Sequence, residues 1–95
     1  MIIPELRDMA AKMKPRDVER MRKFRELLIR FREEKGLGQR ELSLRCDIHH
    51  SKISVLEKKE DSSLTLTTLF ELARGLGVHP KELIDYDFDF SKRNP

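Results

Sequence analysis

The sequence predicts an all-α fold, and three observations lead to this prediction. Apolar residues recur at intervals of three and four along most of the chain, which is the spacing of one helix face. Proline and glycine stand where these patterns begin and end, as they commonly do at helix termini. Strand signals are almost absent, because the best candidate, residues 64–67, alternates apolar and polar side chains over only four residues and runs into a helical pattern.

The first two helical patterns lie before Gly36. Residues 2–13 carry apolar side chains on one helix face, so we expect a short N-terminal helix with Pro4 as its first residue. Pro15 interrupts this pattern and can begin the next helix, which should run to about Lys35 and end at Gly36 in a left-handed conformation. The apolar stripe of this second helix consists of Val18, Met21, Phe24, Leu27, Leu28 and Phe31.

The sequence of residues 38–59 predicts two short helices joined by a tight turn over residues 47–49. Leu42 and Cys46 are expected on the inner face of the first helix. Ile53 and Leu56 anchor the second helix, whose polar side chains then face outwards. This is the layout of a helix-turn-helix, a motif that places its second helix in the major groove of DNA.

Two further helices are expected after this motif. A strongly apolar pattern over residues 66–76 predicts a buried helix that ends at Gly75 or Gly77. The combination of His79 as a cap and Pro80 as first helical residue then predicts the start of a last helix.

Length and composition fit one small domain. The chain has 95 residues, of which 38% are hydrophobic and 39% charged, so its core is small and its surface heavily charged. A lone cysteine excludes an intramolecular disulfide, no apolar run approaches the ~18 residues of a membrane span, and the N-terminus lacks a signal-peptide core. We therefore expect a cytoplasmic protein with an N-terminal helical extension (1–17), a helix-turn-helix domain (18–86) and a C-terminal tail (87–95).

The formal net charge of +3 is unevenly distributed, with +4 over residues 1–35, +1 over residues 36–60 and −2 over residues 61–95. This basic excess is modest, so charge alone does not predict nucleic-acid binding. The helix-turn-helix pattern carries that expectation instead.

Residues 24–86 resemble the five-helix DNA-binding domain of the Cro/repressor family, also called the xenobiotic-response-element type. The resemblance lies in the order and spacing of RFREEKG, of Gln39 followed by REL, of ISVLEKK, and of LARGLGVHPKELI. It implies a lambda-repressor-like fold, preceded in this chain by the N-terminal extension.

The resemblance also implies which side chains contact DNA. Base readout would come from the start of the first motif helix and the N-terminal part of the second, that is from Gln39, His49, His50, Ser51, Lys52 and Val55. Lysine can meet guanine acceptors, whereas valine can make only apolar contact, for example with a thymine methyl group. Phosphate contacts, which give affinity without sequence information, are expected from Arg40, Lys58 and Lys59.

Two further expectations concern structure rather than readout. The family often pairs a glutamate at the position of Glu57 with an arginine at the position of Arg32, and a bidentate bridge between them would fix the second motif helix against the long helix. The family usually has glycine in the turn, where this chain has Asp47. We expect Asp47 to adopt the left-handed conformation at some cost, because aspartate tolerates it better than most residues.

Neither a metal site nor an active site is predicted. Cys46 lies four residues before His50, but adjacent histidines on a helix diverge by about 100° and no second cysteine or histidine pair completes a zinc spacing. No nucleophile, base and orienting group form a recognisable catalytic motif. We therefore expect no metal, no cofactor and no enzymatic activity.

These observations predict a sequence-specific regulator of transcription that binds a double-stranded DNA operator as a homodimer and acts as a repressor. One alternative is an antitoxin, which would neutralise a toxin through residues 1–20 or 86–95 while repressing the shared operon. A second alternative is the controller of a restriction–modification system, which is also small and dimeric.

Overall fold

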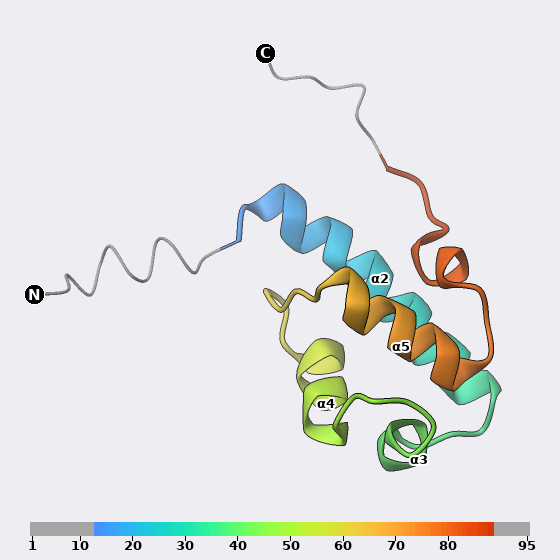
Figure 1. The fold of residues 1–95 in the computed structure, drawn as a ribbon. Helices are drawn as coiled ribbons and strands as arrows, with labels where there is room; N and C mark the ends of the chain where they lie inside the picture. Colours follow the sequence, from blue (N-terminus) through green and yellow to red (C-terminus); the bar gives the residue numbers. More distant parts are fainter. Residues whose placement is uncertain (1–12, 89–95) are drawn as a thin grey trace, which may run out of the picture.

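The long helix α2 (Pro15–Glu34) lies behind α5 (Leu66–Leu76) in the view of Figure 1, and two of the later elements, α4 (His50–Lys58) and the 3₁₀ helix η1 (Pro80–Ile84), pack against it. The structure is a computed structural model that describes residues 13–88. In chain order, α2 is followed by α3 (Gln39–Ser43), α4, α5 and η1. No strand occurs within these residues, which confirms the all-α prediction for this part of the chain. None of the described helices is both long and apolar enough to cross a bilayer.

Proline and glycine set both ends of α2. Pro15 is its first residue and follows Lys14, which has an extended backbone. Beyond the other end, Gly36 adopts a left-handed conformation with φ of +68°, as expected. The expected boundary between residues 17 and 18 falls inside this helix, and the helix expected before Pro15 lies outside the described residues except for its last position.

The helix-turn-helix consists of α3, a turn and α4. The first helix ends at Ser43, so Cys46 belongs to the turn instead of the inner helix face. The expectation for Asp47 was wrong, because no described residue other than glycine has a positive φ. Its backbone N–H donates instead to Oε1 of Glu71 on α5 at 2.8 Å, which fixes the turn without a left-handed residue.

The last element differs from the expected fifth α-helix, because residues 80–84 form a 3₁₀ helix. His79 caps it as expected, and its Nδ1 accepts a hydrogen bond from the backbone N–H of Lys81 at 3.0 Å. The chain leaves helical geometry at Asp85 after only five residues, with φ of −87° and ψ of 78°. A segment this short can use the tighter i→i+3 hydrogen bonds of a 3₁₀ helix.

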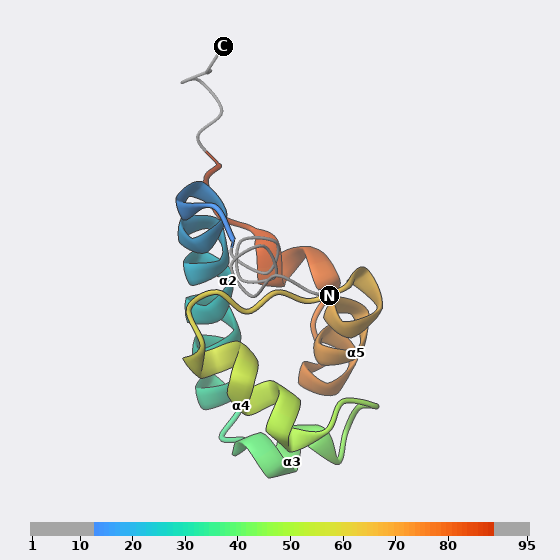
Figure 2. The same ribbon diagram turned by 90° about the vertical axis from the view of Figure 1, so that its left-hand side faces the viewer.

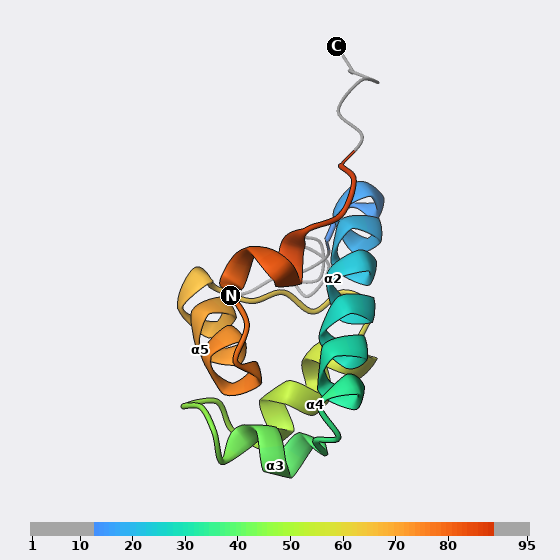
Figure 3. The ribbon, with the colours of Figure 1, turned by 90° about the vertical axis from the view of Figure 1, so that its right-hand side faces the viewer.

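The hydrophobic core lies between α2 on one side and α5 with η1 on the other (Figures 2 and 3). The two motif helices, α3 and α4, cover one end of this core. Its fully buried large side chains are Phe24, Leu28, Leu42, Ile53, Leu56, Leu72 and Leu83. Gly75 allows α5 to approach the motif closely, because a Cβ there would lie 2.8 Å from Cδ1 of Leu42 and 3.1 Å from Cβ of Cys46. The inward faces of α3 and α4 are thus packed against the core, and their outward faces are left exposed to solvent.

Candidate nucleic-acid interface

The helices α3 and α4 lie together at one end of the molecule, and η1 lies towards the other end (Figures 2 and 3). Ile53 and Leu56 are buried on the inner face of α4. This orientation leaves Ser51 and Lys52 exposed on the first turn, and Val55, one turn further on, is 48% exposed. The outward face of α4 therefore combines polar side chains with one apolar side chain.

His49 caps the N-terminus of α4. Its Nδ1 accepts a hydrogen bond from the backbone N–H of Ser51 at 3.1 Å and lies 2.8 Å from the Ser51 hydroxyl. This satisfies one of the free N–H groups at the helix start. The ring packs against that of His50, with 4.3 Å between ring centroids. His49 thus has a structural task in addition to any contact that the rest of its ring makes.

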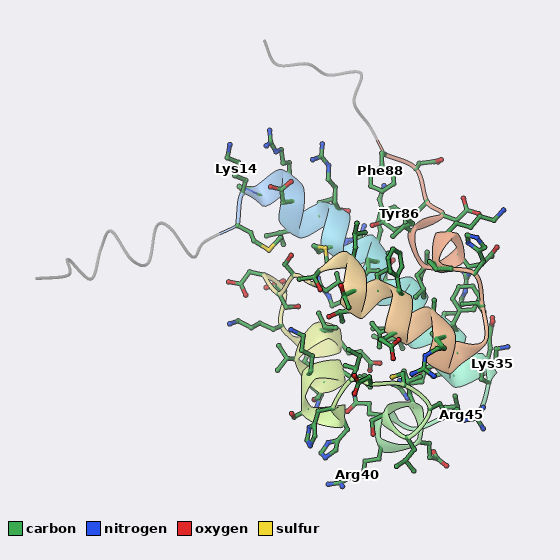
Figure 4. All side chains as sticks on the ribbon, viewed as in Figure 1. Lys14, Lys35, Arg40, Arg45, Tyr86 and Phe88 are labelled. Carbon is green, nitrogen blue, oxygen red and sulfur yellow. The ribbon has the colours of Figure 1, made fainter. Side chains whose placement is uncertain are left out.

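The environment of His50 disfavours its charged form. Desolvation, followed by the positive charge of Arg40 and by the neighbouring His49, lowers the pKa of His50 below its ordinary value of 6.5. In the free protein His50 is therefore neutral at pH 7. Arg40 itself is exposed, and Figure 4 shows it at the outer edge of α3, at the opposite end of the molecule from Tyr86 and Phe88.

The other expected phosphate contacts lie at the far end of α4. Lys58 is the last residue of the helix and Lys59 is its C-cap, and both side chains are exposed. The ammonium group of Lys59 is 4.0 Å from the carboxylate of Asp61, which is a weak surface pairing. Exposed basic groups thus stand near the start of α4, where Arg40 on α3 acts on His50, and at the end of α4, where Lys58 and Lys59 lie.

One nearly buried carboxylate joins the three helices around this face. Glu57 accepts two hydrogen bonds from Arg32, from Nε and from Nη2, each 2.7 Å long. It also accepts a bond from the side-chain amide of Gln39 at 2.9 Å. Only 4% of the Glu57 side chain and 14% of the Arg32 side chain are exposed. The Arg32–Glu57 bridge therefore links α2 to α4, and Gln39 adds α3 to the same group.

Arg32 has a further bond that extends this network. Its Nη1 donates to the carbonyl oxygen of Leu37, which lies between α2 and α3, at 2.9 Å. The hydrogen bond to Glu57 raises the pKa of Arg32 above its ordinary value, so the guanidinium stays charged. Gln39, which is expected to read a base, also donates a hydrogen bond from its amide nitrogen to Glu57, so its role in the structure includes orienting the start of α3.

The cysteine and histidines of the motif do not converge on a metal site. Among residues 13–88, no group of three or more histidine, cysteine, aspartate or glutamate side chains is arranged to hold a metal ion. The thiol of Cys46 donates to the carbonyl oxygen of Leu42 at 3.4 Å, and burial raises its pKa. A raised pKa disfavours the thiolate form that a metal would need.

Sequence reasoning missed two residues that hold the motif from outside it. Arg25 is only 7% exposed and binds the backbone just after α4. Its position seven residues before Arg32, on the inner face of a helical pattern, was the signal that could have identified it. Glu71 binds the backbone of the turn, and its hydrogen bond with Arg74, followed by the bond from Asp47, lowers the pKa of its carboxyl. No spacing rule pointed to this second contact.

Comparison with known proteins relates this geometry to a family. The sequence model of a family described as helix-turn-helix matches residues 28–83. Control protein C.BamHI from Bacillus amyloliquefaciens is 31% identical to the chain over 51 residues. The aligned part covers 54% of this chain and 62% of that protein, so the chain spans less than two-thirds of its relative's length. No solved structure matches the chain.

Replacing Arg32 with alanine tests the role of the buried bridge. The substitution leaves Glu57 with only the amide of Gln39, and we expect the free energy of unfolding to fall by about 3 kcal/mol, as when one partner of a buried ion pair is lost. Thermal denaturation monitored by circular dichroism measures this change in the free energy of unfolding. The matched control is Arg30→Ala on the same helix, which removes an exposed pairing with Glu34 at 3.9 Å and should change stability by less than about 0.5 kcal/mol. Equal melting temperatures for Arg32→Ala and the unaltered chain would contradict the structural role.

Proposed function

The chain belongs to the helix-turn-helix family whose model covers residues 28–83, and from this premise we propose that it is a sequence-specific double-stranded DNA-binding regulator of transcription, acting as a repressor in the cytoplasm. The observation that carries this proposal is the outward face of α4. Its side chains are exposed at one end of the molecule, while its inner face and Glu57 are fixed by the core and by Arg32. A helix presented in this way can enter a major groove without rearrangement of the domain.

The proposed docking assigns distinct tasks to the side chains around α4. His50, Ser51 and Lys52 reach base edges from its first turn, and Val55 offers apolar contact to a thymine methyl group. His49, which precedes this turn, also contacts the DNA while its Nδ1 keeps the capping bond to the N–H of Ser51. Phosphate contacts come from Arg40 on one side and from Lys58 and Lys59 on the other, and they orient the domain on the duplex.

We further propose that the operator is bound by a homodimer that forms through α5 and η1. Leu66 and Phe70, one turn apart on α5, are 67% and 52% exposed, and Ile84 on η1 is 42% exposed. Leu66 and Ile84 also line an open, largely apolar groove of about 200 Å³, together with Met21, Phe24, Leu64, Thr65, Leu69 and Tyr86.

A second copy of this chain is the occupant that this surface fits. Each copy offers an apolar groove and, one turn along α5 from Leu66, the exposed ring of Phe70 that can cover the groove of a partner copy, as a two-fold symmetric contact requires. Contact through η1 and the adjoining face of α5 would also keep α3 and α4 of both copies free for DNA, because they lie at the other end of each molecule. Two half-sites about 34 Å apart would then be read on one side of the duplex.

Two more specific roles fit the same interface. The similarity to a protein named a control protein favours the controller of a restriction–modification system as the second candidate. An antitoxin would instead bind a protein through residues 1–20 or 86–95, which lie partly outside the described residues. Copurification of a toxin that depends on these flanks separates the antitoxin from both regulators.

Selection of binding sites from random duplexes tests the proposed function. The purified chain at moderate salt should enrich a two-fold symmetric motif, and the spacing of its halves should be close to one helical turn or a multiple of it. Replacing Lys52 with alanine should relax the preference at one position of each half. Weak binding that is abolished by salt and enriches no motif would reduce the interaction to phosphate attraction and would contradict the proposal.

The substitution Leu66→Glu tests the proposed dimer. A carboxylate on this apolar surface would be desolvated in the contact, so sedimentation equilibrium should show a monomer at concentrations where the unaltered chain is a dimer. The control is Leu44→Glu, since Leu44 is 86% exposed on the C-cap of α3, away from the groove. Dimerisation of Leu66→Glu with the affinity of the unaltered chain would place the contact elsewhere.

The pH dependence of binding tests the contact of His50 with DNA. Phosphates favour the charged imidazole and raise its pKa in the complex, so binding takes up a proton that the free protein lacks at pH 7. Affinity should therefore rise as pH falls from about 8 towards the pKa of His50 in the free protein and level off below that pKa, and this rise should be smaller in His50→Gln. His79→Gln, which alters a histidine on η1, should keep the dependence. DNA-binding titrations between about pH 5.5 and 8 measure this pH dependence of affinity. The same slope of log affinity against pH for the unaltered chain, His50→Gln and His79→Gln would exclude His50 from the interface.

A further inference from the structure

Arg25 is a buried arginine whose hydrogen bonds go to the backbone at the end of α4. Its side chain projects from α2, and the residue is only 7% exposed. Its Nη1 lies 3.3 Å from the carbonyl oxygen of Lys59 and 3.1 Å from that of Glu60. Arg25 therefore donates to two main-chain carbonyls, whereas Arg32 pairs with a carboxylate. Arg25 thus holds the backbone of residues 59 and 60 against α2.

Within residues 13–88, the Lys59 carbonyl that Arg25 binds also accepts hydrogen bonds from the turn that follows it. These bonds come from the hydroxyl of Ser62 at 2.8 Å and from its N–H at 3.2 Å. Ser62 is 8% exposed, so this cluster is enclosed. Lys59 is the C-cap of α4, where the backbone leaves helical geometry, and a cation at this carbonyl end is favourable because of the helix dipole.

Arg25 and Arg32 lie two helical turns apart on the same face of α2 and therefore bind α4 at two points. Arg32 binds the side chain of Glu57, and Arg25 binds the carbonyls of Lys59 and Glu60. The buried residues Ile53 and Leu56 and the Arg32–Glu57 bridge already hold the inner face of α4, and Arg25 adds an attachment where the chain leaves the helix, which fixes the position of that end.

We propose that Arg25 is a positioning residue for DNA recognition: it sets the tilt of α4 and places Lys58 and Lys59 against the phosphate backbone. This inference rests on the proposed function. The exposed basic pair lies at the attachment that Arg25 provides, with Lys59 contributing the bound carbonyl itself. Loss of that attachment lets the pair move relative to the first turn of α4, which carries the base contacts.

The test compares Arg25→Met, which keeps the length of the side chain but removes its donors, with Arg25→Lys, which keeps a cation able to reach a carbonyl. Affinity for the selected site and for a random duplex is measured over a range of salt concentrations, and melting temperatures are measured in parallel. Leu76→Val on α5, a buried position away from α4, serves as the control for loss of stability alone.

We expect Arg25→Met to bind the selected site about tenfold more weakly, because the displaced Lys58 and Lys59 lose a phosphate contact. The slope of log affinity against log salt should become shallower by about one, as for one lost phosphate contact. Arg25→Lys should recover most of both quantities, and Leu76→Val should keep the slope of the unaltered chain despite a lower melting temperature. Unchanged affinity and slope in Arg25→Met, or failure of Arg25→Lys to recover them, would overturn the positioning role.

Two further results complete the test. If Arg25→Met does not fold, Ser62→Ala takes its place, because it removes another donor to the same Lys59 carbonyl and should also make the slope shallower. An unaltered slope in Ser62→Ala would then overturn the inference. Failure of the unaltered chain to select any site would refute the proposed function, whereas normal selection with no effect of Arg25→Met would refute only the role of Arg25.

Discussion

The geometry of the DNA-facing end depends on one nearly buried carboxylate, that of Glu57. A charged group with so little access to water is tolerable only when its hydrogen-bonding capacity is used, and here Arg32 and Gln39 use it. Because these donors come from α2 and α3, the requirement to satisfy one charge fixes three helices relative to one another. Stability of the fold and orientation of α4 are therefore parts of the same interaction.

The sequence predicted where the described helices begin, but it did not predict the helix type of η1. Pro15 and Gly36 predicted both ends of α2, because their backbone preferences are local. The match to the helix-turn-helix family confirms the resemblance drawn from Gln39 and the motif that follows it. The start signal at His79 was correct, but a cap followed by proline begins an α-helix and a 3₁₀ helix equally well, so the type of η1 could not be predicted.

The contacts that the sequence could not predict are those between distant elements. Arg25 reaches a carbonyl 34 residues later, and Glu71 reaches the N–H of a residue 24 positions earlier. Main-chain groups carry no sequence signature, so a side chain that binds them leaves no pattern to recognise. The Arg32–Glu57 bridge was anticipated only because both partners are side chains in a familiar arrangement. The roles of the exposed side chains of α4 remain predictions, since exposure makes contact with DNA possible without specifying its partner.

The bond between Glu71 and the turn has an evolutionary consequence. A left-handed turn restricts its residue to glycine and a few tolerant alternatives, whereas this turn has no such residue and is held by a carboxylate on α5. The turn is therefore constrained by a side chain distant in sequence instead of by the backbone conformation of its own residue. Position 47 should accept any residue that keeps its backbone N–H, whereas position 71 should keep a side chain that can accept this hydrogen bond. Because the bond goes to the main chain, the two positions can change independently.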